Sequence, residues 1–267
     1  MAASRTALVF VVSLCMCTHD SAAPLDPTGD GVVIVGVYAD AGAAQACVEA
    51  ARRMFEWMGY QVTRIDAATV NDGVIDHIDV FYFPGGSSGP YRRDIRDSGR
   101  DRIRDRIRAG CAYIGTCAGG LFGASRNLWD GASSSDGLMG VFQGLAAGPI
   151  PDIFEYPEIG MCKVTLSRSH PISASLPDTA WILFYNGPYF IPDTGDAAVV
   201  ATYDITGHAA IVASSYGHGR VVLTGPHPEW EEDSDRDGVS YFDHFDDRGS
   251  EWDLMQRATR WCLHELE

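Results

Sequence analysis

Positive charge is scarce in this sequence of 267 residues. Lysine and arginine together number 20, against 36 aspartate and glutamate residues, and the formal net charge is −16. Proteins whose main partner is nucleic acid or an anionic membrane surface need the opposite balance. We therefore exclude both partners and attribute the acidity to solubility.

A long apolar run is also missing. The best candidate, Thr6–Cys17, has about a dozen residues and is too short for a membrane span, so no stable membrane insertion is expected. With the small residues Ser21-Ala22-Ala23 behind it, it predicts a signal peptide over residues 1–23 and a secreted or periplasmic protein. Lipid attachment at Cys15 or Cys17 ranks below secretion, because the preceding residues fit the lipobox pattern poorly.

Cysteine is the third sparse residue. Removal of the predicted signal leaves five thiols, and in an oxidising compartment an odd number suggests that one is kept free. Cys117 is the natural candidate for the free thiol, and the other four form either two disulfides or core thiols. Cys47 with Cys262 is the more plausible pair, because the first and last predicted helices share a face in one arrangement of a doubly wound sheet.

Strand and helix patterns alternate along the first half of the chain, as in a doubly wound parallel sheet. We find no internal repeat and no second domain boundary, so we predict a linker over 24–31 and a single α/β domain over 32–267. The expected strands are 32–38, 61–65, 78–83, a fourth before Cys117, 161–167, 181–185, 197–203, 209–214 and 220–224, and the expected helices are 41–58, 95–109 and 251–265. Residues 127–157 are rich in Gly, Ser and Asp and are expected to hold little regular structure.

Arginines crowd the segment from Arg92 to Arg108. They form either an anion-binding patch or a solvated helix face that pairs its own charges. Aspartates alternate with the arginines at helical spacing, at positions 94, 97, 101 and 105, and this favours the solvated face.

The segment Tyr113–Phe122 has the pattern of a short strand, a tight turn and the start of a helix. Cys117 stands at the turn, with glycine two residues before it and two residues after it, as in a nucleophile elbow with Cys in place of Ser. Glycine suits the flanking positions because side chains there collide with the neighbouring strand and helix. A buried structural cysteine in a Gly-rich turn is the alternative.

A cysteine nucleophile needs a base, and the base needs an orienting group. His227 follows a predicted strand, whose end lies on the same edge of the sheet as the elbow. Glu229 is two residues further on, where its carboxylate can hold the imidazole. The N–H of Ala118 and that of Gly85 or Gly86 are the candidate oxyanion donors.

Two further segments are less decisive. Tyr185, Asn186 and Tyr189 are candidates for a substrate pocket, and a hairpin turn with core aromatics is an equal alternative. The acidic loop that contains Asp233, Asp235 and Asp237 has the spacing of half a Ca²⁺ loop but lacks its last ligand, so a solvated loop is favoured.

The order and spacing of three motifs resemble the class I glutamine amidotransferase-like superfamily, and within it the biotin-protein ligase N-terminal domain group. The motifs are Pro84-Gly85-Gly86, Gly115-Thr116-Cys117-Ala118-Gly119 and Pro226-His227-Pro228-Glu229, and the resemblance spans roughly residues 32–264. It implies a three-layer, doubly wound, mostly parallel flavodoxin-like fold and a Cys117–His227–Glu229 triad. Glutaminase members commonly carry Gln four residues after the nucleophile, where this chain has Leu121.

These observations predict a secreted cysteine-dependent amidotransferase-like hydrolase that acts on a small-molecule amide or acyl substrate. The motifs call for no cofactor, and they leave the oligomeric state open. A non-catalytic small-molecule-binding or regulatory module of the same fold is the alternative.

Overall fold

Five parallel strands form the central part of the sheet. The computed structural model describes residues 31–193, 195–231, 234–245 and 248–267, so the predicted signal peptide lies outside the described residues. The parallel strands stand in the order β2 (Gln61–Ile65), β1 (Ile34–Tyr38), β3 (Val80–Phe83), β4 (Ala112–Thr116) and β13 (Gly219–Thr224). Every residue of β3 and β4 is buried, because helices cover both faces of these strands.

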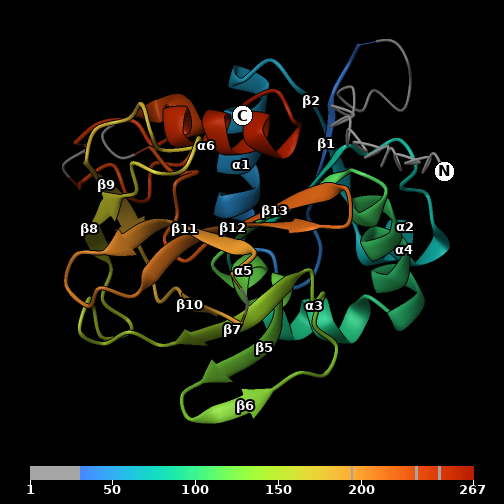
Figure 1. Ribbon diagram of the computed structural model, residues 1–267, viewed down its shortest axis with the longest axis horizontal. Helices are drawn as coiled ribbons and strands as arrows, with labels where there is room; N and C mark the ends of the chain where they lie inside the picture. Colours follow the sequence, from blue (N-terminus) through green and yellow to red (C-terminus); the bar gives the residue numbers. More distant parts are fainter. Residues whose placement is uncertain (1–30, 194, 232–233, 246–247) are drawn as a thin grey trace, which may run out of the picture.

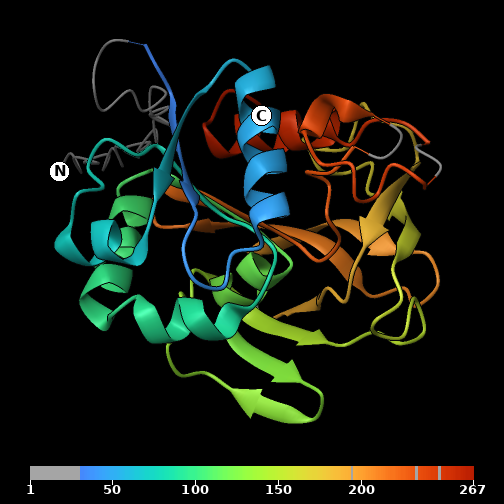
Figure 2. The ribbon, with the colours of Figure 1, turned by 180° about the vertical axis from the view of Figure 1, so that it is seen from behind.

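Helices cover the two faces of the parallel strands as separate layers. One face carries α1 (Gln45–Trp57) and α6 (Trp252–Cys262), which lie together in Figures 1 and 2. The other carries α2 (Ala67–Asp72), α3 (Ser88–Asp94), α4 (Asp97–Arg108) and α5 (Ala118–Gly123). Alternate residues of β3 serve the two layers: Val80 and Tyr82 pack with α1, and Phe81 and Phe83 pack with the second set. The predicted three-layer α/β fold is confirmed.

The sheet continues beyond β13 mainly through antiparallel pairs. From β13 the order is β12 (Ala209–Tyr216), β10 (Tyr189–Pro192), β7 (Phe142–Gly148), β5 (Ala124–Trp129) and β6 (Ala132–Ser134). β11 (Ala197–Tyr203) branches from β12, followed by β8 (Gly160–Leu166) and β9 (Thr179–Phe184). Residues 127–157, expected to be irregular, therefore contribute to three strands, and that prediction is wrong. Their Gly- and Ser-rich sequence forms strands through pairing with distant segments.

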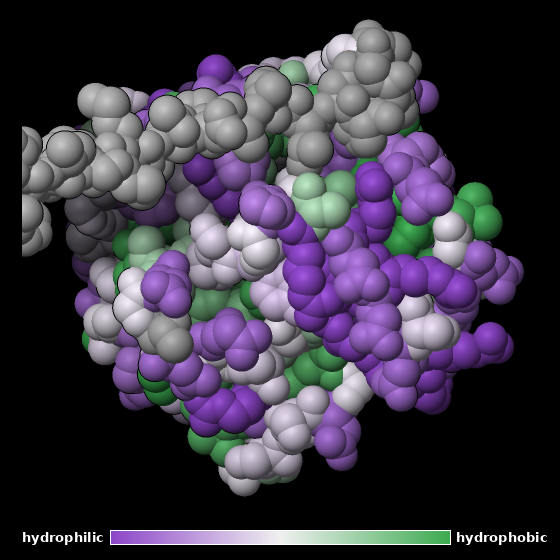
Figure 3. All heavy atoms as spheres, turned by 45° about the vertical axis from the view of Figure 1, so that its right-hand side comes forward, coloured by the Kyte–Doolittle hydropathy of each residue, from purple (hydrophilic) through white to green (hydrophobic). Residues whose placement is uncertain are grey.

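The arginine-rich segment is divided into two helices. Ile95 leaves the helical conformation, which separates α3 from α4. Three salt bridges run along α4, from Asp97 to Arg100, from Asp101 to Arg104 and from Asp105 to Arg108. The solvated, self-paired face is thus what α4 forms, and the surface on this side of the molecule is broadly hydrophilic (Figure 3).

All five cysteines in the described residues are buried free thiols. Of the two alternatives for the cysteines other than Cys117, core thiols therefore hold, and Cys47 and Cys262 are not paired, because their side chains pack in different clusters. Cys47 lies beside Leu183 and Trp230, whereas Cys262 lies in the core under α6. Within the described part of the chain, no helix is long and apolar enough to cross a membrane.

Candidate active site

Cys117 occupies a strained turn between β4 and α5. Its backbone has φ +50° and ψ −105°, a conformation that L-residues rarely adopt and that persists only where the surroundings impose it. A hydrogen bond of 2.8 Å from its N–H to the Thr224 carbonyl of β13 helps to hold the turn. The glycine after it is required for packing: a Cβ at Gly119 would lie 1.8 Å from the Phe83 carbonyl oxygen.

His227 and Glu229 meet just beyond the end of β13. Nδ1 of His227 lies 2.9 Å from Oε1 of Glu229, and the two residues are 2% and 0% exposed. The imidazole stacks on Trp230 with ring centres 4.4 Å apart, and the backbone N–H of His227 donates a hydrogen bond of 2.8 Å to the Leu183 carbonyl oxygen. The ring is therefore held on its Nδ1 side, while Nε2 is buried without a hydrogen-bond partner among the described residues.

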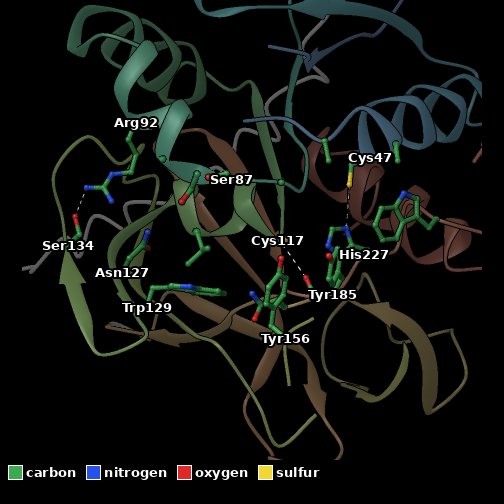
Figure 4. Close-up of a pocket in the computed structure, with 18 of the residues that line it drawn as sticks. Cys47, Ser87, Arg92, Cys117, Asn127, Trp129, Ser134, Tyr156, Tyr185 and His227 are labelled. Atoms are coloured by element: carbon green, nitrogen blue, oxygen red, sulfur yellow. Dashed lines mark hydrogen bonds between the residues drawn. The ribbon is translucent and has the colours of Figure 1, made fainter. Parts of the chain in front are cut away.

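Electrostatics favour the protonated form of this histidine. Burial alone lowers the pKa of His227, but the negative charges of Glu229 and of a Cys117 thiolate act in the opposite direction. Their combined effect raises the His227 pKa well above 6.5. The predicted base and its orienting carboxylate thus form one buried unit beside Cys117, as Figure 4 shows for the histidine.

Two of the predicted oxyanion donors are backbone N–H groups that follow the ends of β3 and β4. Within the described part of the chain, no hydrogen bond uses the N–H of Gly86 or that of Ala118. Gly86 lines the same pocket as Cys117. Gly85 also leaves room for the imidazole, because a Cβ there would lie 2.3 Å from Cε1 of His227.

The elbow opens into a pocket of about 830 Å³. Tyr185 and Asn186, two of the three residues predicted for a substrate pocket, line it, and the Cys117 thiol lies 4.0 Å from the Tyr185 carbonyl oxygen. Tyr189 is not one of its lining residues and stacks on His208 at 4.2 Å instead. The hairpin alternative is wrong, because β9 pairs with β8 whereas β10 pairs with β7 and β12. Asn186, at φ +53°, lies in the segment that joins the two strands, and it lines the pocket together with Tyr185.

Comparison with known proteins assigns the family. The family model described as "Biotin-protein ligase, N terminal" matches residues 33–252. The chain belongs to this family. It is 35% identical over 161 residues to an uncharacterized protein of Chlamydia muridarum, a match that covers 55% of this chain and 59% of that protein. It is 32% identical over 158 residues to a biotin–protein ligase of Schizosaccharomyces pombe, which covers 55% of this chain and 25% of the ligase.

A solved structure confirms the fold of this family member. A crystal structure of glutamine amidotransferase superposes with a TM-score of 0.56 at 20% identity, covering 73% of this chain and 90% of the other. The expected class I glutamine amidotransferase-like fold is therefore confirmed. The chain spans about three-fifths of the chlamydial relative and a quarter of the yeast ligase. Membership of the family therefore does not assign the activity of either whole protein to this chain.

Cys47 is a site residue that the sequence analysis missed. Its sulfur lies 3.8 Å from Nδ1 of His227, and burial raises the pKa of this thiol to about 12. Cys47, His227 and Glu229 also have ligand atoms within 4.8 Å of one another, which makes them the group in the described residues that could hold a metal ion. The residues are 180 positions apart, so no local spacing links Cys47 to the site.

The acidic loop that follows the His-Pro-Glu motif is stabilised by hydrogen bonds within the loop. Asp235–Asp237 forms a short 3₁₀ turn, and Asp233 lies outside the described residues. The two carboxylate oxygens of Asp237 accept hydrogen bonds from the backbone N–H groups of Glu231 and Val239. Asp237 therefore organises the loop that follows the His-Pro-Glu motif.

Proposed function

We propose that this protein is an exported, cysteine-dependent hydrolase of small-molecule amides. The single observation that carries the proposal is the strained Cys117 elbow beside a buried His227–Glu229 pair with a raised histidine pKa. Backbone strain and perturbed titratable groups concentrate at functional sites, since a purely structural role rarely repays their cost.

The chemistry divides into two stages. His227 takes the proton of the Cys117 thiol, and the sulfur attacks the carbonyl carbon of the substrate. The N–H groups of Ala118 and Gly86 stabilise the oxyanion, and His227 returns the proton to the departing amine. Water then hydrolyses the thioester with His227 as the base, which releases the acid and restores the thiol. Glu229 stabilises the imidazolium formed in both stages.

A binding module is the second candidate, and one observation favours it. Nε2 of His227 has no hydrogen-bond partner among the described residues, and the Cys117 thiol is directed at the Tyr185 carbonyl oxygen, 4.0 Å away. Such contacts in ligand-free enzymes often tighten only when substrate is bound. The two candidates therefore predict different fates for a bound amide: the hydrolase cleaves it, and the binding module releases it unchanged.

The deciding experiment compares the wild-type protein with Cys117→Ala. We expect wild type to release amine from members of an amide panel that includes glutamine, and to be alkylated by iodoacetamide at Cys117 on peptide mapping. Mapping is needed because Cys47 is a second thiol in the site. Cys111→Ala is the matched control, because Cys111 is a buried thiol outside the residues that line the pocket, and it should keep turnover. Turnover that survives in Cys117→Ala, or a Cys117 thiol that iodoacetamide does not modify, contradicts the hydrolase.

A further inference from the structure

The pocket extends far beyond what an amide group occupies. Its volume of about 830 Å³ lies toward the upper end of the range for small-molecule sites. Cys117 and His227 lie at one end, and Figure 4 shows Arg92 and Ser134 at the other. Leu121 and Trp129 also line it, so apolar surface accompanies the polar groups.

The end of the pocket that contains Arg92 and Ser134, here called the far end, differs in charge from the rest of the protein. Acidic residues outnumber basic ones by 36 to 20 in the whole chain. Among the described residues that line the pocket, however, none is aspartate or glutamate, and Arg92 is the one lysine or arginine. A ligand carboxylate at this end therefore meets one fixed positive charge and no fixed negative one.

Arg92 is held in position but retains unused donors. Its Nε donates to the Asp136 carbonyl at 2.7 Å, and one terminal nitrogen donates to the Ser134 hydroxyl. A guanidinium has five N–H donors, and the bonds to the Asp136 carbonyl and the Ser134 hydroxyl use two of them. The planar fork that remains suits a carboxylate, which binds such a group through two parallel hydrogen bonds.

Asn127 adds an independent indication of a ligand. It lies in β5 directly opposite Ser134 in β6 and is only 6% exposed. Its Oδ1 is buried without a hydrogen-bond partner among the described residues. A buried, unpaired amide oxygen is costly to leave without a partner, so a ligand N–H that pairs with it is stabilised there.

We propose that the far end recognises a carboxylate, with the adjacent N–H of the ligand on Asn127. This rests on the proposed function and narrows its substrate to extended acyl compounds, such as short peptides, that end in a free carboxylate. Arg92 binds the carboxylate, the apolar surface accommodates the connecting chain, and the amide to be cleaved lies at Cys117.

Binding to the full-length Cys117→Ala protein tests this without any need for turnover. The probes are N-acetylated oligoglycines of increasing length, each as the free acid and as the C-terminal carboxamide, measured by calorimetry. We expect the acid to bind about tenfold more tightly than the carboxamide at the best length, because the carboxylate forms charge-assisted hydrogen bonds. Arg92→Gln should abolish this preference and leave carboxamide binding unchanged.

Arg93→Gln is the matched control, because Arg93 pairs with Asp94 and does not line the pocket. Should Arg92→Gln fail to fold, Arg92→Lys keeps the charge without the planar fork and should weaken the preference. Equal affinity for acid and carboxamide, a preference that survives in Arg92→Gln, or no binding of any acid overturns the proposal. Acid binding without hydrolysis by wild type would instead refute the hydrolase and leave the carboxylate site standing.

Discussion

At the Cys117 end of the pocket, Cys117 and His227 stand on turns that follow the buried parallel strands β4 and β13. At the Arg92 end the site residues stand on a seven-residue helix and a two-stranded hairpin at the edge of the sheet. Cys117 and His227 are 6% and 2% exposed, whereas Arg92 is half-buried and Ser133 is exposed. The buried Cys117 end holds its side chains in fixed positions. At the more exposed Arg92 end, side chains can be substituted with less effect on the core. Separate parts of the fold thus provide the chemical step and the recognition of the substrate.

The largest effect is expected where backbone segments approach most closely. Gly119→Ala places a methyl group 1.8 Å from the Phe83 carbonyl oxygen, and neither backbone segment can give way easily. We expect the free energy of unfolding to fall by about 3 kcal/mol, measured by urea denaturation. Gly195→Ala is the control, because its Cβ has no neighbour within 4 Å. If Gly119→Ala unfolds at the same urea concentration as wild type, the elbow is not rigid.

The next effect concerns geometry rather than stability. Gly85→Ala brings a methyl group within 2.3 Å of the His227 ring, which must shift. A displacement of this size is expected to reduce turnover and Cys117 alkylation by about 100-fold. Gly89→Ala, in the same pocket wall, meets only Ser87 at 3.7 Å and should behave as wild type. If both variants alkylate at the same rate, the position of His227 does not matter.

Removal of the Glu229 carboxylate tests its electrostatic effect on His227. Glu229 raises the His227 pKa, so Glu229→Gln should lower it and reduce turnover by about tenfold. Because the folded-state pKa is above the unfolded value of 6.5, the imidazolium stabilises the fold below that pH, and the stabilisation is lost as the pH rises through the folded pKa. The stability deficit of Glu229→Gln should therefore be largest at acidic pH. Urea denaturation across the pH range measures this, and a deficit independent of pH contradicts it.

The two ends also differ in how far they can be predicted from sequence. The elbow is a local pattern, because strain at Cys117 and close packing at Gly119 restrict the neighbouring residues within a few positions. His227 and Glu229 are likewise separated by a single proline. The sequence predicts a solvated face for Arg92, because no local pattern indicates that Ser134 lies against it. That proximity arises from long-range strand pairing, which local patterns do not record.

The hairpin did carry one local signal. Asp130-Gly131 has positive φ at both positions and joins β5 to β6, which is the preferred sequence for a tight hairpin turn. Recognition of this pair would have placed Asn127 opposite Ser134. It would not have found Cys47, whose approach to His227 depends on how α1 packs on the sheet.

The smallest effect is expected at Ser134, and it separates the two ends most clearly. Ser134→Ala removes one hydrogen bond from Arg92 and leaves the bond to the Asp136 carbonyl, so the guanidinium is held less firmly. We expect the affinity for carboxylate-terminated oligoglycines to fall by about threefold, because Arg92 keeps its charge and its bond to the Asp136 carbonyl and exchanges only the Ser134 bond for one to water. Turnover at saturating substrate should not change, because Cys117 and His227 stay in place. Ser133→Ala is the matched control, as Ser133 lines the pocket without contacting Arg92. A lower saturating rate in Ser134→Ala would show that the two ends are coupled, and the division of chemistry from recognition would then be wrong.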